Sequence, residues 1–265
     1  MPNSTVEVIA ELAATHDGQY RQGVEAIREV ACFGGANAVK IQWTSSAEAR
    51  ARSRQLMPQN YALLQFPLEY LGGWADVARA YGLDFMCTVY LPEDILLVAP
   101  LVKAFKVASL EACWKDFLDA HLVYGKPLYI STGATNWFEL EELLEYRYTY
   151  PQVRLLQCTS IYPANSDEVD LEAIRFHHLD GYSDHTRCLI AGACAVMAGA
   201  TIVEVHARGF DTQATNPDYA HSFDPVELGA YIRNVRQAEM LKGDERKTIH
   251  PREVPLRAHR GGQPS

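Results

Sequence analysis

The chain has 265 residues, of which 48% are hydrophobic and 22% are charged, a composition typical of one large globular domain. Its formal net charge of −9 argues against a nucleic-acid or anionic-membrane partner, because long-range repulsion would oppose binding. The net charge does not exclude a small anionic substrate, provided that lysines line one pocket.

The N-terminal residues carry neither the basic nor the apolar segment of a secretory signal, so we expect a cytoplasmic protein. The longest charge-free stretch, residues 188–203, is too short and too broken to span a membrane. The six cysteines lack C-x-x-C spacing, which favours reduced thiols over disulfides or a zinc site.

Short apolar runs alternate with longer amphipathic patterns along the chain, which is typical of repeated β-α units with a parallel sheet. We expect strands at residues 6–13, 36–42, 84–88, 104–108, 127–131, 153–158, 179–183 and 201–206. We expect helices at residues 24–33, 68–81, 93–101, 114–124, 137–146, 171–177, 187–198 and 225–241. Eight alternating units, with no G-x-G-x-x-G after the first strand, predict a single-domain (β/α)₈ barrel rather than an open doubly wound sheet.

Two segments interrupt this rhythm. Residues 44–67 are too long for a plain β-α loop, and in a barrel such loops often build the active-site face. Residues 242–265 are polar, basic and rich in Pro and Gly, so we expect a partly ordered tail after a barrel domain of residues 1–241.

Two histidines each close a short apolar run, at Gly181-Tyr-Ser-Asp-His185 and Ile202-Val-Glu-Val-His206. If both runs are barrel strands, both imidazoles emerge at the same end and can hold one divalent ion. The neighbouring Asp184 and Glu204 are predicted to orient the two rings. A metal-dependent enzyme is therefore the leading interpretation.

Polar side chains also follow the other predicted strands, at the end where barrel active sites are built. They are Glu11, Lys40, Gln42, Thr88, Lys106, Ser109, Glu111, Ser131, Ser160, Tyr162 and Ser183. Taken singly, a lysine could extend its head to solvent, a serine could cap a helix and a glutamate could form a structural ion pair. Together they favour a site in which lysines and hydroxyls bind a phosphate while the metal polarises an aldehyde oxygen.

Seven motifs in chain order resemble the sialic acid synthase family. They are Ile9-Ala-Glu11 with Thr15-His-Asp-Gly18, Asn37-Ala-Val-Lys-Ile-Gln42, Lys106-Val-Ala-Ser109, Ser131-Thr-Gly133, Gln157-Cys-Thr-Ser-Ile-Tyr-Pro163, Gly181-Tyr-Ser-Asp-His-Thr186 and Glu204-Val-His206. The resemblance implies a (β/α)₈ synthase that condenses phosphoenolpyruvate with the open-chain aldehyde of an N-acylated hexosamine. The product would be a nine-carbon 2-keto sugar acid, and phosphate would leave by carbon–oxygen cleavage.

The resemblance also implies roles for individual residues. His185 and His206 would bind Mn²⁺ or Mg²⁺. The residues expected to bind phosphoenolpyruvate are Lys40, Thr88, Lys106, Ser109, Ser131, Ser160, Tyr162 and Ser183. Glu11, Gln42 and Glu111 would be catalytic, Asp218 would contact the acceptor, and the family's habit suggests a homodimer.

The chain departs from the family pattern at four places, one of which is the turn Thr15-His-Asp-Gly18, where the family has an Asn-His-Asn-Gly-like turn. Val205 stands where a Lys or Arg is common, so we expect one basic contact to be missing. The family's Gly-Pro-Asp reads Asn216-Pro-Asp218, and the sequence stops about where a C-terminal antifreeze-like domain would begin. The acceptor is therefore left open as a sugar or sugar-like aldehyde, and the basic tail could cover the site.

Two rival interpretations remain. One is a metal-dependent aldolase or lyase that uses a pyruvate-like donor and releases no phosphate. The other is a non-catalytic barrel that binds a sugar acid or a partner protein, although both histidines and both lysines are retained.

Overall fold

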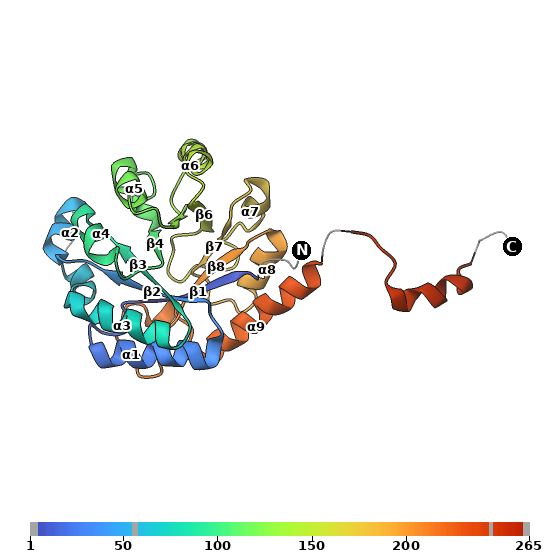
Figure 1. The fold of residues 1–265 in the computed structure, drawn as a ribbon, viewed down its shortest axis with the longest axis horizontal. Coiled ribbons are helices and arrows are strands. Elements are labelled where there is room, and N and C mark those ends of the chain that lie inside the picture. The colour runs from blue at the N-terminus through green and yellow to red at the C-terminus, as the bar shows by residue number, and fades with distance from the viewer. Residues whose placement is uncertain (1–4, 55–57, 244–245, 262–265) are drawn as a thin grey trace.

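The computed structural model describes residues 5–54, 58–243 and 246–261. Eight parallel strands pair in chain order, and β8 closes the barrel against β1. The strands are β1 Glu7–Ala13, β2 Ala38–Trp43, β3 Asp84–Val89, β4 Ala104–Val107, β5 Leu128–Ser131, β6 Val153–Cys158, β7 Gly181–Asp184 and β8 Ile202–His206. Helices surround them (Figure 1), so the predicted single-domain (β/α)₈ fold is confirmed.

Each predicted helix is present, with ends that differ by a few residues. The helices are α1 Tyr20–Glu29, α3 Leu68–Ala80, α4 Pro92–Val98, α5 Lys115–Leu122, α6 Trp137–Thr149, α7 Glu172–Phe176, α8 Ala191–Ala198 and α9 Pro225–Lys242. The predicted insertion at residues 44–67 contains a helix that the pattern did not predict, α2 Ala47–Arg54, and a 3-10 segment, Pro58–Leu64. Residues 55–57 of this insertion lie outside the described ranges.

The strands are buried on both faces, as expected for a parallel sheet covered by helices. One face of each strand packs under the helices, and Val8, Ala10 and Leu12 of β1 belong to that outer core. The other face fills the barrel with an apolar layer: Ile9, Ala38, Met86, Ala104, Tyr129, Leu156 and Ile202. This layer, called the plug below, makes the lower barrel solid rather than a pore.

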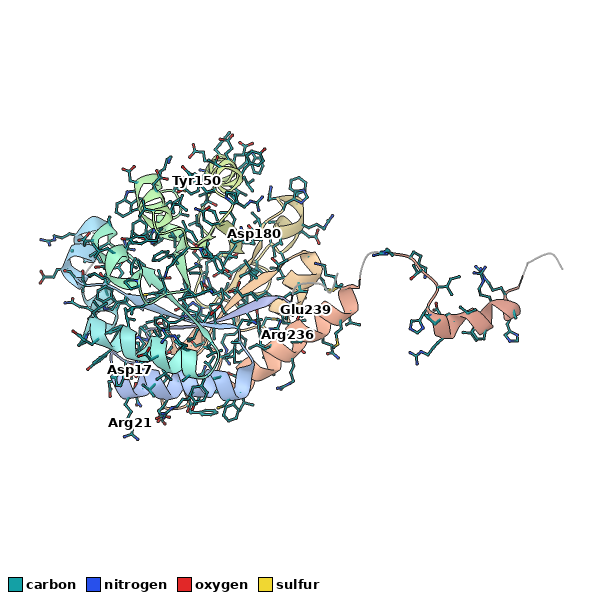
Figure 2. All side chains as sticks on the ribbon, viewed as in Figure 1. Asp17, Arg21, Tyr150, Asp180, Arg236 and Glu239 are labelled. Atoms are coloured by element: carbon teal, nitrogen blue, oxygen red, sulfur yellow. The ribbon has the colours of Figure 1, made fainter. Side chains whose placement is uncertain are left out.

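The last helix ties the start of the chain to the barrel. Arg236 of α9 donates a hydrogen bond to the carbonyl of Val6 at 2.6 Å, and Glu239 accepts the Val6 N–H. Figure 2 shows both side chains on the part of α9 that passes the N-terminal strand. The first strand is thereby held in register by the element that ends the barrel.

Beyond α9 the chain forms a 3-10 segment, Pro251–His259, that has no buried residue. It stands away from the barrel past the end of α9 (Figure 1). Residues 244–245 and 262–265 of the predicted tail lie outside the described ranges. Among the helices described, none is both long and apolar enough to cross a membrane.

Gly181, at the start of β7, has no room for a side chain. A Cβ there would lie 2.3 Å from the Ile202 carbonyl oxygen and 2.7 Å from a methyl of Leu156. We expect Gly181→Ala to lower the free energy of unfolding by about 1–3 kcal/mol, because neighbouring strands must separate. Urea denaturation measures this change.

Gly72→Ala is the matched control, because a Cβ at Gly72 in α3 meets nothing within 4 Å. There alanine should raise stability by about 0.5–1 kcal/mol through helix propensity. An equal response in the two variants would show that the contact between β7 and β8 is not tight.

Candidate active site

A polar layer lies directly above the plug. Side chains alternate along a strand, so the residue two positions after a plug residue also faces the barrel interior. Ile9 is followed by Glu11, Ala38 by Lys40, Met86 by Thr88, Ala104 by Lys106, Tyr129 by Ser131, and Ile202 by Glu204. The barrel therefore turns a scattered set of strand-end residues into one polar floor.

These side chains border a small cavity of about 30 Å³ at the carboxyl ends of the strands, room for a few water molecules. Its lining is Glu11, Lys40, Gln42, Thr88, Lys106, Ala108, Ser109, Ser131, Tyr162, Ser183, His185, Glu204 and His206. Larger hollows lie outside the barrel, such as one of 770 Å³ between α7, α8 and α9. We place the site in the small cavity because there the charged and polar groups converge from all eight strands and their following loops.

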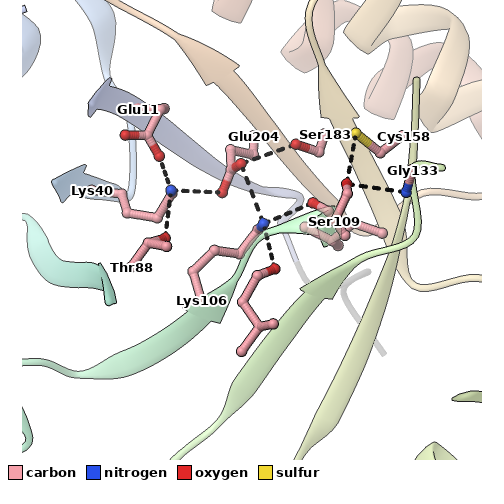
Figure 3. A network of polar contacts seen from close by, with 12 residues as sticks. Glu11, Lys40, Thr88, Lys106, Ser109, Gly133, Cys158, Ser183 and Glu204 are labelled. Atoms are coloured by element: carbon pink, nitrogen blue, oxygen red, sulfur yellow. Dashed lines mark hydrogen bonds and ion pairs between the residues drawn. The ribbon is translucent and has the colours of Figure 1, made fainter. Parts of the chain in front are cut away.

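A chain of ion pairs crosses the polar floor (Figure 3). Lys40 pairs with Glu11, and its Nζ donates to Thr88 Oγ1 at 2.9 Å. Glu204 lies between the two lysines, with Oε2 3.9 Å from Lys40 Nζ and Oε1 3.7 Å from Lys106 Nζ. Two buried cations are thus balanced by two buried carboxylates.

The electrostatics of this cluster keep Glu204 ionised. Burial works to raise the pKa of the Glu204 carboxyl, but Lys106 and Lys40, together with a hydrogen bond from Ser183 at 3.0 Å, bring the pKa below its ordinary value. Burial lowers the pKa of Lys40 to about 8, with the charge of Glu204 opposing the shift. Glu204, which was expected from the sequence to orient a histidine, instead lies between the two lysines and is a central residue of the site.

One side of the cavity offers small donors. Lys106 Nζ donates to Ser131 Oγ at 2.7 Å, and the Gly133 amide donates to Ser109 Oγ at 3.1 Å. A Cβ at Gly133 would lie 2.2 Å from Ser160 Oγ and 2.8 Å from Ser109 Oγ. The hydroxyls close tightly around this glycine, and Ser160 stands just behind the cavity lining.

The two predicted metal-binding histidines do meet, with ring centroids 5.3 Å apart. His185 Nδ1 lies 2.7 Å from the Thr159 carbonyl, to which it donates, so the lone pair of Nε2 is left for another ligand. Burial lowers the pKa of both imidazoles, and that of His206 falls well below its usual range. Neutral imidazoles are what a divalent ion requires.

The two rings fit a metal site that water or substrate completes. Within the described ranges, no group of three or more His, Cys, Asp or Glu side chains is arranged to hold an ion. A metal here would therefore take only two protein ligands.

Asp184 does not orient His185, contrary to the expectation from sequence. It lies two positions after Tyr182, which belongs to the outer core, so its side chain points away from the cavity. Asp184 accepts hydrogen bonds from the Tyr231 hydroxyl at 2.7 Å and the Thr186 amide at 2.8 Å. Its role is to anchor β7 to α9.

Glu111 lies outside the cavity, held by an arginine that the sequence analysis did not single out. Arg50 of α2 places Nη2 2.5 Å from Glu111 Oε1, and both side chains are buried. The guanidinium also lies over the rings of Tyr90 and Tyr61, at 4.5 and 5.2 Å from their centroids. The insertion therefore reaches down to the barrel mouth and neutralises Glu111.

Asp218 also stands back from the cavity lining. Its Oδ2 accepts the Ala14 amide at 3.0 Å, and its own carbonyl accepts the Ser222 hydroxyl at 2.6 Å. The loop after β8 is thereby joined to the loop after β1, above the histidine pair.

A sequence model of the NeuB family matches residues 27–247 of this chain. The chain belongs to the NeuB family. This confirms the resemblance to sialic acid synthases drawn from the motifs.

Among named relatives, an N,N'-diacetyllegionaminic acid synthase of Legionella pneumophila is 29% identical, over 96% of this chain and 78% of its own length. A pseudaminic acid synthase of Campylobacter jejuni is also 29% identical, over 90% of this chain and 75% of its own. The crystal structure of N-acetylneuraminic acid (sialic acid) synthetase from Leptospira borgpetersenii superposes with a TM-score of 0.88 at 24% identity, covering 98% and 93% of the chains. The prediction of an enzyme is confirmed by these synthases.

Val205 stands where a basic residue was expected from the family pattern. Its side chain does not line the cavity. It is 2% exposed and belongs to the outer core, one position from the inward-facing Glu204 and His206. Strand alternation points this side chain toward the helices, so a basic contact missing at this position would lie outside the cavity.

The loop after β1 in this NeuB-family barrel is fixed by a buried histidine. His16 is fully buried between Phe66 and Trp74, at ring-centroid distances of 5.0 and 4.7 Å. Its Nδ1 accepts the Gly18 amide at 3.0 Å. Burial lowers the pKa of His16 from 6.5 to about 4.

Because the unfolded chain binds a proton at His16 near pH 6.5 and the folded chain only near pH 4, stability should fall as pH drops through this window. Between these two pH values, His16 should lower the free energy of unfolding by up to about 1.4 kcal/mol for each unit that the pH falls. We expect His16→Asn, which can still accept the Gly18 amide, to show a shallower loss. Urea denaturation at several pH values compares the slopes, and identical slopes would contradict the assignment.

Proposed function

We propose that this chain condenses phosphoenolpyruvate with the aldehyde of a sugar or sugar-like acceptor, giving a 2-keto-3-deoxy acid and free phosphate. The observation that carries the proposal is the pair of buried lysines beside two neutral imidazoles in one cavity. Family membership and the relatives' names as sugar-acid synthases support the same chemistry.

The polar floor has the chemistry of a site for a phosphorylated carboxylate. Lys40 and Lys106 supply charge, while Thr88, Ser131 and the Gly133 side of the cavity supply hydroxyl and amide donors. Phosphoenolpyruvate needs more room than the cavity of about 30 Å³ provides. Its binding would therefore move side chains, and its anionic groups would take over lysine contacts that Glu11 and Glu204 now make.

The proposed reaction forms one carbon–carbon bond and breaks one carbon–oxygen bond. C3 of phosphoenolpyruvate attacks the aldehyde carbon, and the aldehyde oxygen takes up a proton. The positive charge left at C2 is met by water, after which the bond from C2 to the phosphate oxygen breaks. Phosphate leaves, and the water oxygen remains as the keto group of the product.

His185 and His206 would hold Mn²⁺ or Mg²⁺, which when bound polarises the acceptor aldehyde. The hydrogen bond from His185 to Thr159 supports this assignment because it presents the other ring nitrogen to the cavity. Tyr162 packs on the His185 ring at 4.0 Å between centroids and limits its rotation.

A carboxylate inside the cavity is better placed than Glu111 to accept the proton of the attacking water. Glu11 and Glu204 both line the cavity, and Glu204 is held ionised. Glu111 is neutralised by Arg50 outside it. We therefore assign proton transfer to Glu11 and Glu204, and an acceptor-side role at the mouth to Gln42, Glu111 and Asp218.

The six cysteines of the chain are all free, which supports the proposal that the enzyme works in the reducing cytoplasm. An aldolase or lyase with a pyruvate-like donor would use the same imidazoles but would have little need for two buried ammonium groups. Phosphate release separates the two reactions.

The test is phosphate release from phosphoenolpyruvate by purified protein with Mn²⁺, across a panel of aldehyde sugars that includes N-acetylmannosamine. We expect acceptor-dependent release that a chelator abolishes. His185→Ala should lose this turnover while keeping its melting temperature, since residues at the mouth of a barrel contribute little to its core. Condensation without phosphate, or full activity in His185→Ala, would refute the proposal.

Gly133→Ala gives a second test, aimed at the donor site alone. A Cβ at this position would collide with Ser160 and Ser109, so we expect phosphoenolpyruvate affinity to fall at least tenfold, about 1.4 kcal/mol. Isothermal titration measures it, and Gly72→Ala serves as the control far from the cavity. Unchanged affinity would show that the phosphate of phosphoenolpyruvate does not bind beside the loop after β5.

A further inference from the structure

A third imidazole stands beside the histidine pair. His221, in the 3-10 turn Tyr219–His221 after β8, is 6% exposed. Its ring lies edge to face with that of His206, at 4.7 Å between centroids. It also contacts Tyr162, at 5.1 Å, so one tyrosine ring touches all three imidazoles.

The two proposed metal ligands differ in how their second nitrogen is satisfied. His185 gives its Nδ1 proton to the Thr159 carbonyl. His206 Nδ1 is buried with no hydrogen-bond partner in the described part of the chain. A buried polar nitrogen without a partner is costly, and a metal-binding histidine ordinarily uses its second nitrogen to fix its ring.

His221 is placed to supply that partner. The two ring centres are 4.7 Å apart, close enough for a nitrogen of one ring to hydrogen-bond a nitrogen of the other when the two face each other. Its own Nε2 is buried and lies 3.4 Å from Asp218 Oδ1, too poorly aligned for a hydrogen bond as it stands. If that nitrogen carries the proton, the carboxylate holds it there, and Nδ1 of His221 is left as an acceptor.

Asp218 is itself fixed in position. Its second oxygen accepts the Ala14 amide at 3.0 Å, and its backbone amide donates to Asn216 Oδ1 at 2.9 Å. The carboxylate is therefore a rigid support from the loops above the barrel rather than a mobile surface group.

We infer that His221 is the positioning residue for His206, accepting a hydrogen bond from its Nδ1–H while Asp218 fixes the tautomer of His221. This rests on the proposed function, in which His206 binds the metal through Nε2. His221 acts behind the ligand and is not a third ligand, since no three suitable side chains of the described residues converge on one ion. The proposed chain of contacts runs from the Asp218 carboxylate to the His221 imidazole, then to the His206 imidazole and the metal.

The test compares His221→Phe with His221→Gln. Phenylalanine keeps the ring contact with His206 but cannot accept a hydrogen bond from its Nδ1–H, whereas the glutamine amide oxygen can. We expect His221→Phe to weaken Mn²⁺ binding by about 10- to 100-fold in isothermal titration. It should also shift the visible spectrum of bound Co²⁺. His221→Gln should recover most of the affinity, and metal-free phosphoenolpyruvate affinity should stay unchanged in both variants.

His259→Phe, on the exposed segment past α9, is the matched control and should behave as wild type. Wild-type Mn²⁺ affinity and Co²⁺ spectrum in His221→Phe would overturn the inference while leaving the proposed metal site intact. Equal losses in the Phe and Gln variants, with lower melting temperatures, would also overturn it, because the role would then be packing. A wild-type protein that binds no Mn²⁺ would instead refute the metal assignment itself.

Discussion

The balance of charge inside the barrel is the constraint on which this site depends. Lys40 and Lys106 are buried above an apolar plug, where an unpaired ammonium group would strongly oppose folding. Glu11 and Glu204 neutralise them from the neighbouring strands β1 and β8. The folded protein thus buries two cations in a charge-compensated form. Under the proposed function, an incoming anion would exchange one set of ion pairs for another rather than create new ones.

Strand alternation explains why so much of this arrangement could be predicted from the sequence. In a closed parallel barrel, every second residue of each strand faces the interior, so a Lys, Thr or Ser two positions after an inward apolar residue also faces the interior, nearer the mouth. The predicted strands had the correct phase at Lys40, Lys106 and Ser131, and the barrel placed them together. The same rule, applied to β7 and β8, would have assigned Asp184 and Val205 to the outer face of the barrel.

Contacts between loops could not be predicted in this way, because nothing in a single sequence fixes which distant loops meet. The Arg50–Glu111 pair joins the insertion after β2 to the loop after β4, and the Asp218 contact with Ala14 joins the loops after β8 and β1. Helix α2 has few large apolar residues, so its sequence shows no clear helical period. Its contact with the barrel is made by a charged residue, Arg50, and not by an apolar face. These loop contacts hold Glu111 and Asp218 outside the cavity lining.

The apolar plug has a consequence for the order of events. Because the lower barrel is filled by Ile9, Met86, Tyr129, Leu156 and their neighbours, the polar floor can be reached only from the mouth. Under the proposed function, phosphoenolpyruvate on the lysines would therefore bind before the acceptor that lies above it, beside the insertion. Because the reaction would join the two molecules, the phosphate set free at the lysines would leave after the sugar acid, so a single entrance would order both binding and release.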